Sequence, residues 1–266
     1  MNEILEPGAI GPSVTRLQEA LLSKGFSPGV VDGRFGLGTL AALLAFQRSE
    51  VMLADGIAGP RTLAALGLAA SPDLPDASTG MTAQIVSKMC PDTPISNIKR
   101  SLPIVLQSLA RFRLSHRTMV LMAIATIRAE TESFLPISEG KSKFNTSPNG
   151  HPFDLYDHRK DLGNDATFDG ERYKGRGFVQ LTGRHNYIRY GKKLNPTMNL
   201  AATPDLANSA PVAADLLSLF LADRELQIKD ALMHGNMQAA RRLVNGGVHG
   251  LERFTEAYRI GDALLE

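Results

Sequence analysis

Apolar residues recur along most of the chain with the three- and four-residue spacing of amphipathic helices. The first apolar stripe follows Ser13, which we expect to cap a helix, and a second helix ends at Phe46. Residues Met119–Arg128 are apolar on nearly all sides and predict a central, buried helix. Four further helical patterns span residues 212–222, 225–234, 236–245 and 251–264. Strand patterns are poor, so the sequence favours a mainly α fold.

Residues 138–178 interrupt this helical periodicity. The segment is rich in Gly, Asn, Asp, Ser and aromatic residues and has no regular apolar stripe. A long irregular segment inside a compact domain is usually functional. Half of the aromatic residues fall within residues 144–190, where they could line a sugar-binding cleft or pack beneath the loop. The tyrosines are the better cleft candidates, because their hydroxyl groups need hydrogen-bond partners.

A linker divides the chain into two parts. Residues 69–81 read AASPDLPDASTGM, with two prolines, two acids and no apolar stripe. The length of 266 residues agrees with two domains. We expect a small three-helix domain over residues 1–68 and a larger domain over residues 82–266.

The first part contains an internal repeat. The pattern DGxxGxxTLAAL begins at Asp32 and again at Asp55, 23 residues later. In each copy Asp-Gly favours a tight turn, and the two leucines share one helix face. Residues 8–68 resemble the small three-helix peptidoglycan-binding domain of bacterial cell-wall hydrolases, which implies peptidoglycan as their partner. Arg34 and Arg61, in the repeat loops, are candidate wall contacts.

Two glutamates of the larger part are candidates for acid–base catalysis. Glu130 follows the buried apolar helix, where desolvation favours the protonated carboxyl that a general acid requires. Glu139 comes nine residues later, and Pro136 opposes a helix between them, so a turn can bring the two carboxylates together. Paired carboxylates with room for one water are the machinery of an inverting glycosidase. Surface glutamates at a helix end are the alternative, and Glu132 competes for the role of acid.

A second motif offers uncharged hydrogen-bonding groups. Residues 172–187 read RYKGRGFVQLTGRHNY, and their glycines permit a close approach of the backbone to a ligand or to another element. Gln180, Thr182 and Asn186 suit sugar hydroxyl and N-acetyl groups, and Thr182 could either hold a nucleophilic water or cap the helix that follows it. A third element, RRLVNGG at residues 241–247, places Asn245 beside two glycines, which could equally be a helix C-cap.

Together, AETESF…SE, YxGRGxxQLTGxxNY and RRxVNGG resemble family 19 glycoside hydrolases, which include plant-type chitinases and lysozyme-like endolysins of bacteriophages. The resemblance covers roughly residues 85–260 and implies an α+β lysozyme-like fold and an inverting mechanism. It implies Glu130 as general acid, Glu139 as general base and Thr182 as the residue that steadies the catalytic water. The candidate substrate contacts are Gln180, Asn186, Asn245 and Arg253, which match family positions, and Tyr173, the tyrosine of the YKGRG motif.

Composition and charge exclude several other classes. The net charge is +2, and the excess of basic residues after residue 80 is too dispersed to argue for a nucleic-acid partner. The single cysteine, Cys90, excludes a disulfide framework. The six histidines form no HExxH motif, so we expect neither a metal site nor a cofactor.

The sequence also sets expectations for localisation. The apolar stretch Thr118–Ile127 is too short to span a membrane. The N-terminus lacks the apolar core of a secretory signal. We therefore expect a monomer made in the cytoplasm without membrane insertion, which acts on the cell wall after release, as a phage endolysin does.

The expected function is hydrolysis of β-1,4 glycosidic bonds in peptidoglycan, with residues 1–68 holding the enzyme on the wall. A chitinase would use the same residues, but the wall-binding module and the absence of tryptophan argue against it. A non-catalytic wall-binding protein is a third possibility, which the Glu130/Glu139 pair opposes. A zinc amidase is a more distant option.

Overall fold

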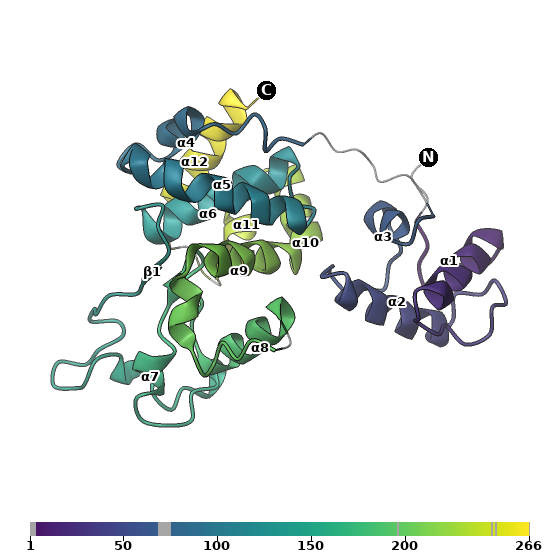
Figure 1. Ribbon diagram of the computed structural model, residues 1–266, viewed down its shortest axis with the longest axis horizontal. Helices are drawn as coiled ribbons and strands as arrows, with labels where there is room; N and C mark the ends of the chain where they lie inside the picture. The colour runs from purple at the N-terminus through teal and green to yellow at the C-terminus, as the bar shows by residue number, and fades with distance from the viewer. Residues whose placement is uncertain (1–3, 69–75, 196, 246, 248, 266) are drawn as a thin grey trace. The chain divides into compact units, whose positions relative to one another are not determined.

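The chain folds as two compact units, Met1–Pro75 and Asp76–Glu266, in a computed structural model. The structure describes residues 4–68, 76–195, 197–245, 247 and 249–265. Both units are mainly helical, as predicted (Figure 1). Residues 69–75 of the expected linker lie outside the described residues. The rest of that segment belongs to the second unit, where Asp76 forms a β-bridge with His116 and Met81 is buried.

The first unit contains the three expected helices, α1 (Pro12–Ser23), α2 (Leu37–Ser49) and α3 (Pro60–Ala65). Their buried faces form one apolar core, which includes Leu17, Leu43 and Phe46. The prediction that Ser13 caps α1 is wrong. Gly11 is the N-cap and Ser13 lies within the first turn, where its hydroxyl accepts a hydrogen bond from Arg16 at 2.9 Å. Pro12 begins the helix without loss, because the first helical N–H has no intrahelical partner.

A buried glutamine of α1 holds the first copy of the repeat. Gln18 is 1% exposed, and its Nε2 donates to Asp32 Oδ1 at 3.1 Å and to Thr39 Oγ1 at 3.0 Å. Its Oε1 accepts from the backbone N–H of Gly33 at 2.8 Å. The bond from Gln18 is the main cause that lowers the pKa of Asp32. The amide of Gln18 thereby joins the Asp-Gly turn to the helix that follows it.

Gln47 of α2 repeats this arrangement for the second copy. Its Nε2 donates to Asp55 Oδ1 at 2.8 Å and to Thr62 Oγ1 at 3.4 Å, and its Oε1 accepts from Gly56 N at 3.0 Å. The repeated Asp, Gly and Thr are therefore the partners of a glutamine that precedes each copy. Buried amides need such partners, because an unsatisfied polar group costs about 1–3 kcal/mol.

The helical core of the second unit surrounds α6 (Arg117–Thr131). Every residue from Met119 to Ala129 is buried, which confirms the predicted central helix. Helix α6 packs chiefly against α12 (Leu251–Leu264), and α4 (Ala83–Met89) packs against α12 and α5 (Ile95–Arg111). Helix α9 (Ala210–Ala222) packs against α5. Helices α10 (Glu225–Met233) and α11 (Met237–Asn245) form an adjacent pair.

The irregular segment includes α7 (Asp169–Arg172). In the view of Figure 1 the loops around α7 lie below α9, as does α8 (Arg184–Leu194). Its regular structure is limited to short elements: β1 (Ile137–Ser138), η1 (Asp154–Tyr156), η2 (Lys160–Leu162), α7 and β2 (Arg176–Gly177). Another short turn, η3 (Pro204–Asn208), precedes α9. Strands β1 and β2 are antiparallel, with Ile137 opposite Gly177 and Ser138 opposite Arg176. This two-residue pairing is the minor β component of the fold.

Candidate active site

Glu130 lies in the last turn of α6 and pairs with a buried arginine. Its side chain is 11% exposed, and Oε1 accepts a hydrogen bond from Nη2 of Arg241 at 2.7 Å. Arg241, on α11, is fully buried and also donates to the carbonyl of His249 at 3.0 and 3.1 Å. The Glu130 carboxyl therefore faces a buried cation.

The chain turns sharply between Glu130 and Glu139, but earlier than Pro136. Helix α6 ends at Thr131, and Glu132 and Phe134 adopt positive φ angles of 46° and 56°. Phe134 is buried, with its ring centroid 6.5 Å from that of Phe178. This contact with the segment after β2 fixes the position of the turn. Burial of Phe134 therefore explains the turn better than Pro136 does.

Glu139 follows β1, where backbone pairing continues one residue further. Its N–H donates to the carbonyl of Gly175 at 2.7 Å. The carboxylate accepts three hydrogen bonds: at Oε1 from Asn145 Nδ2 and from the Tyr156 hydroxyl, both at 2.9 Å, and at Oε2 from Gly175 N at 3.2 Å. Asn145 is fully buried. These donors fix the direction of the Glu139 carboxylate.

Gly175 brings the second motif against Glu139. A methyl side chain at this glycine would lie 2.8 Å from Gln180 Oε1, 3.1 Å from Glu139 Oε2 and 3.2 Å from Thr182 Oγ1. These three oxygens therefore gather around the position that a Cβ atom would take, and a side chain there would force the Gln180 amide to shift. The Thr182 hydroxyl donates to the Gln180 carbonyl at 2.8 Å. Gln180 has a positive φ of 49°, and its Nε2 donates to the Ile137 carbonyl at 3.0 Å.

Two further candidates lie close to this motif. Asn186, on α8, donates from Nδ2 to the Thr182 carbonyl at 2.8 Å. Tyr173 is only 4% exposed, and its ring lies 5.6 Å from that of Tyr187. The ring of Tyr173 is thus part of the packed interior below the loop, which does not fit the direct sugar contact expected for it. Helix α8 has Gly183 as N-cap and no side-chain cap.

The remaining candidates, Arg253 and Asn245, come from the C-terminal part of the second unit. Arg253, on α12, forms an ion pair with Glu132. The extra carboxylate that follows α6 therefore neutralises the expected cleft arginine. Asn245 ends α11, and its side chain lies outside the described residues.

Three residues of this geometry were not singled out from the sequence. Arg241 lies inside the RRLVNGG motif, which the sequence shows, but its pairing with Glu130 could not be predicted from the sequence. Tyr156 was among the tyrosines considered for a cleft, without an assigned partner. Asn145 gave no sequence signal, because only the path of an irregular loop brings it to Glu139. The separation of the two carboxyl groups stays a prediction.

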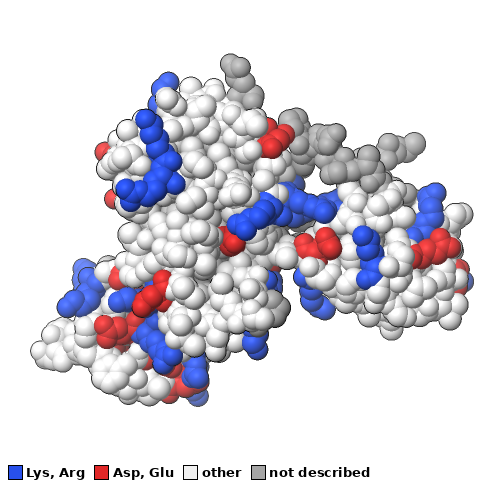
Figure 2. Space-filling model, viewed as in Figure 1, with Lys and Arg blue, Asp and Glu red and all other residues white. Residues whose placement is uncertain are grey.

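Charges of both signs lie interspersed over the face shown in Figure 2. Among the residues that the structure describes, no group of three or more His, Cys, Asp or Glu could hold a metal ion. No helix within the same residues is long and apolar enough to cross a membrane. In the loops of the first unit Arg34 is exposed, whereas Arg61 is half-buried.

Comparison with known proteins supports both parts of the expected architecture. Residues 10–66 match the family model described as "Putative peptidoglycan binding domain". The chain is 50% identical over 56 residues to the N-acetylmuramoyl-L-alanine amidase CwlM of Mycobacterium tuberculosis, which covers 21% of this chain and 14% of that protein. It is 26% identical over 105 residues to a glycosyl hydrolase family 19 domain-containing protein of Haemophilus influenzae, which covers 40% and 48% respectively.

The matches span less than half the length of these two relatives. Among solved structures, chitinase C from Streptomyces griseus HUT6037 aligns with a TM-score of 0.45 and 17% identity, over 69% of this chain and 77% of that chain. The expected peptidoglycan-binding domain is confirmed by the family match, and the expected likeness to family 19 by the Haemophilus influenzae protein.

Tyr156 should titrate far above an ordinary tyrosine. Burial, and then the neighbouring Glu139, raise the pKa of Tyr156 from 10 to about 12, since both disfavour the phenolate. Because the folded-state pKa is the higher one, this phenol contributes stability below pH 10 that is lost as the pH rises from 10 to 12. Tyrosinate absorbance of wild type and Tyr156→Phe should differ by one phenol with a midpoint near pH 12.

Glu139→Gln provides the matched comparison. It should lower the midpoint of Tyr156, whereas Tyr258, whose pKa burial also raises to about 12, should keep its own. A Tyr156 midpoint that does not respond to Glu139→Gln would contradict the contact between the two side chains.

Proposed function

We propose that this chain is a cell-wall hydrolase that cleaves β-1,4 glycosidic bonds of peptidoglycan with inversion, using Glu130 as general acid and Glu139 as general base. The observation that carries the proposal is the gathering of the Glu139 carboxylate and the Thr182 hydroxyl around Gly175. The peptidoglycan-binding domain of residues 10–66 and the family 19 likeness support the same substrate and reaction.

The base side is suited to orient a water molecule. Thr182 donates its own proton to the Gln180 carbonyl, so its oxygen remains an acceptor. A water that donates one proton to Thr182 Oγ1 and one to Glu139 Oε2 directs its lone pair away from both. Asn145 and Tyr156 hold Oε1 of Glu139, whereas Oε2 accepts one bond, from the Gly175 N–H, and keeps a second lone pair to take the proton as the water attacks the anomeric carbon.

The acid side is suited to lose a proton. Arg241 engages Oε1 of Glu130, so the proton is carried on Oε2 and passes to the leaving oxygen as the glycosidic bond breaks. The transfer leaves Glu130 as a carboxylate beside the buried guanidinium. Arg241 therefore stabilises the carboxylate of Glu130 that the proton transfer produces.

The first unit supplies attachment to the substrate. Peptidoglycan is an insoluble network, so a wall-bound module raises the effective concentration of a linked catalytic unit at that surface. The Gln18 and Gln47 amides hold the two repeat loops in defined conformations, as a binding surface requires.

Glu130→Gln should abolish hydrolysis of purified peptidoglycan, with Glu132→Gln as its control. The amide still accepts from Arg241, but it cannot donate the proton, so the rate should fall by about 10²–10⁴-fold. Glu132→Gln breaks only a half-exposed ion pair with Arg253 and should have a mild effect. Mass spectrometry of the products identifies the reducing-end sugar. A folded Glu130→Gln enzyme near wild-type activity, or intact glycan strands with freed peptides, would refute the proposal.

Thr182 should act through its hydroxyl. Thr182→Ser keeps the water contact and should retain most turnover. Thr182→Val keeps the shape but loses the contact, and misplacement of a reacting atom by about 1 Å costs roughly 10²-fold in kcat. Both rates are measured per folded molecule, because Thr182→Val also removes the bond to the Gln180 carbonyl, worth about 1 kcal/mol of stability. Equal kcat values for the two variants would exclude the water-positioning role.

A further inference from the structure

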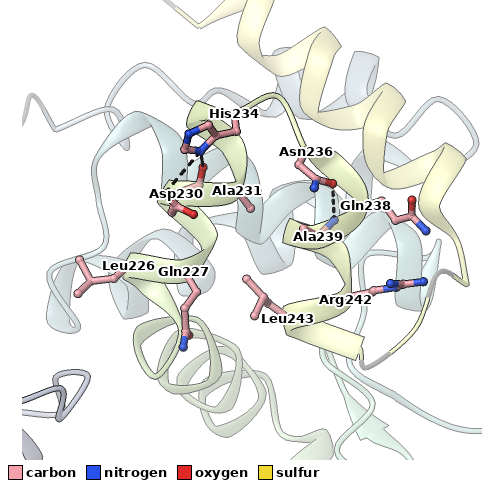
Figure 3. A pocket seen from close by; sticks show the side chains of 10 residues that line it. All are labelled: Leu226, Gln227, Asp230, Ala231, His234, Asn236, Gln238, Ala239, Arg242 and Leu243. Carbon is pink, nitrogen blue, oxygen red and sulfur yellow. Dashed lines mark hydrogen bonds and ion pairs between the residues drawn. The ribbon is translucent and has the colours of Figure 1, made fainter.

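Helices α10 and α11 border a surface cavity of about 760 Å³, open to solvent, that the reaction above does not use. Its lining residues, among those that the structure describes, come from these helices and the segment that joins them (Figure 3). Cavities of several hundred Å³ with a few placed polar groups are typical of small-ligand sites. Apolar, amide and charged side chains all contribute: Leu226, Leu243, Gln227, Gln238, Asp230 and Arg242.

The two helices contribute charges of opposite sign. Asp230 lies on α10 and is 74% exposed, with His234 at 3.5 Å. Arg242 lies on α11 and is exposed. Arg242 forms no ion pair with any residue in the part of the chain that the structure describes. Figure 3 shows Asp230 and Arg242 on the two different helices of the cavity. A ligand that carries both an ammonium and a carboxylate matches this distribution.

The cavity shares helix α11 with Arg241, the residue that bonds the proposed acid. Arg241, which holds Glu130, and Arg242, which lines the cavity, are consecutive residues of α11. Successive helical residues point about 100° apart, so one side chain faces the core while the next faces the cavity. A glycan whose scissile bond reaches Glu130 thus has its neighbouring substituents close to α11.

We propose that the α10–α11 cavity binds the stem peptide of peptidoglycan, with a peptide carboxylate on Arg242 and the free amine of its diamino acid on Asp230. The proposal rests on the hydrolase function proposed above. Leu226 and Leu243 suit alanine methyl groups, and Gln227 and Gln238 suit peptide N–H and C=O groups. Chitin carries no peptide, so this contact selects peptidoglycan strands from a polymer with the same glycosidic linkage.

Hydrolysis of matched glycans tests this site. One substrate is soluble peptidoglycan strands that keep their stem peptides, and the other is the same strands after the peptides have been removed. We compare kcat/KM on the two for wild type, Arg242→Gln and Asp230→Asn. The control is Arg259→Gln, which removes an exposed positive charge of α12 outside the cavity.

Each cavity variant should reduce the preference for peptide-bearing strands roughly fivefold, as expected for one exposed charge contact. The loss should arise mainly in KM, because the peptide is remote from the bond that breaks. Arg259→Gln should keep the wild-type preference. An unchanged preference in both cavity variants would overturn the inference.

Direct binding separates this inference from the proposed function. The tripeptide L-Ala-γ-D-Glu-meso-diaminopimelate, titrated into the isotope-labelled full chain, should shift amide signals of α10 and α11, and Arg242→Gln should weaken that binding. If neither glycan is cleaved, the hydrolase function fails, while the titration still decides whether the cavity takes the peptide. If glycans are cleaved but the tripeptide shifts no signal of these helices, the inference is wrong and the hydrolase function stands.

Discussion

The pairing of Glu139 with the backbone of Gly175 is the constraint on which the proposed chemistry depends. The two-residue sheet of β1 and β2 fixes the register, and Gly175 allows Glu139, Gln180 and Thr182 to approach one Cα atom. A register shift of one residue would turn the Glu139 side chain to the opposite face. Phe134 precedes β1 and Phe178 follows β2, and the buried contact between their rings stabilises the same register. A very short sheet therefore determines where the base lies.

The two carboxyl groups lie in different electrostatic settings. Glu130 pairs with a cation, the fully buried Arg241, whereas Glu139 accepts bonds from the neutral donors Asn145, Tyr156 and Gly175. Carboxyl groups in different settings can take different roles, as acid and base catalysis requires. The assignment of Glu139 as base rests on the position of Thr182 beside its carboxylate.

Periodicity predicted the helices well, because each buries an apolar stripe, and α6 is apolar all round. Local chemistry was less reliable. Serine is a residue type that is preferred at N-caps, yet the N-cap of this helix is Gly11 and its first residue is Pro12. The candidate site was likewise predicted only in part. Motifs identified Glu139, Gln180 and Thr182, whose side chains meet at Gly175. Asn145 and the buried state of Tyr173 depend on the path of an irregular loop, which no periodicity describes.

The stereochemistry of the first product tests the two-carboxylate account most directly. Proton NMR, recorded while peptidoglycan strands are being cleaved and before the products mutarotate, identifies the anomer released. If Glu139 acts through a water, β-1,4 bonds yield the α-anomer, and the carboxyl groups stand about 6.5–9.5 Å apart. Initial release of the β-anomer would show retention and would contradict the roles given to Glu139 and Thr182.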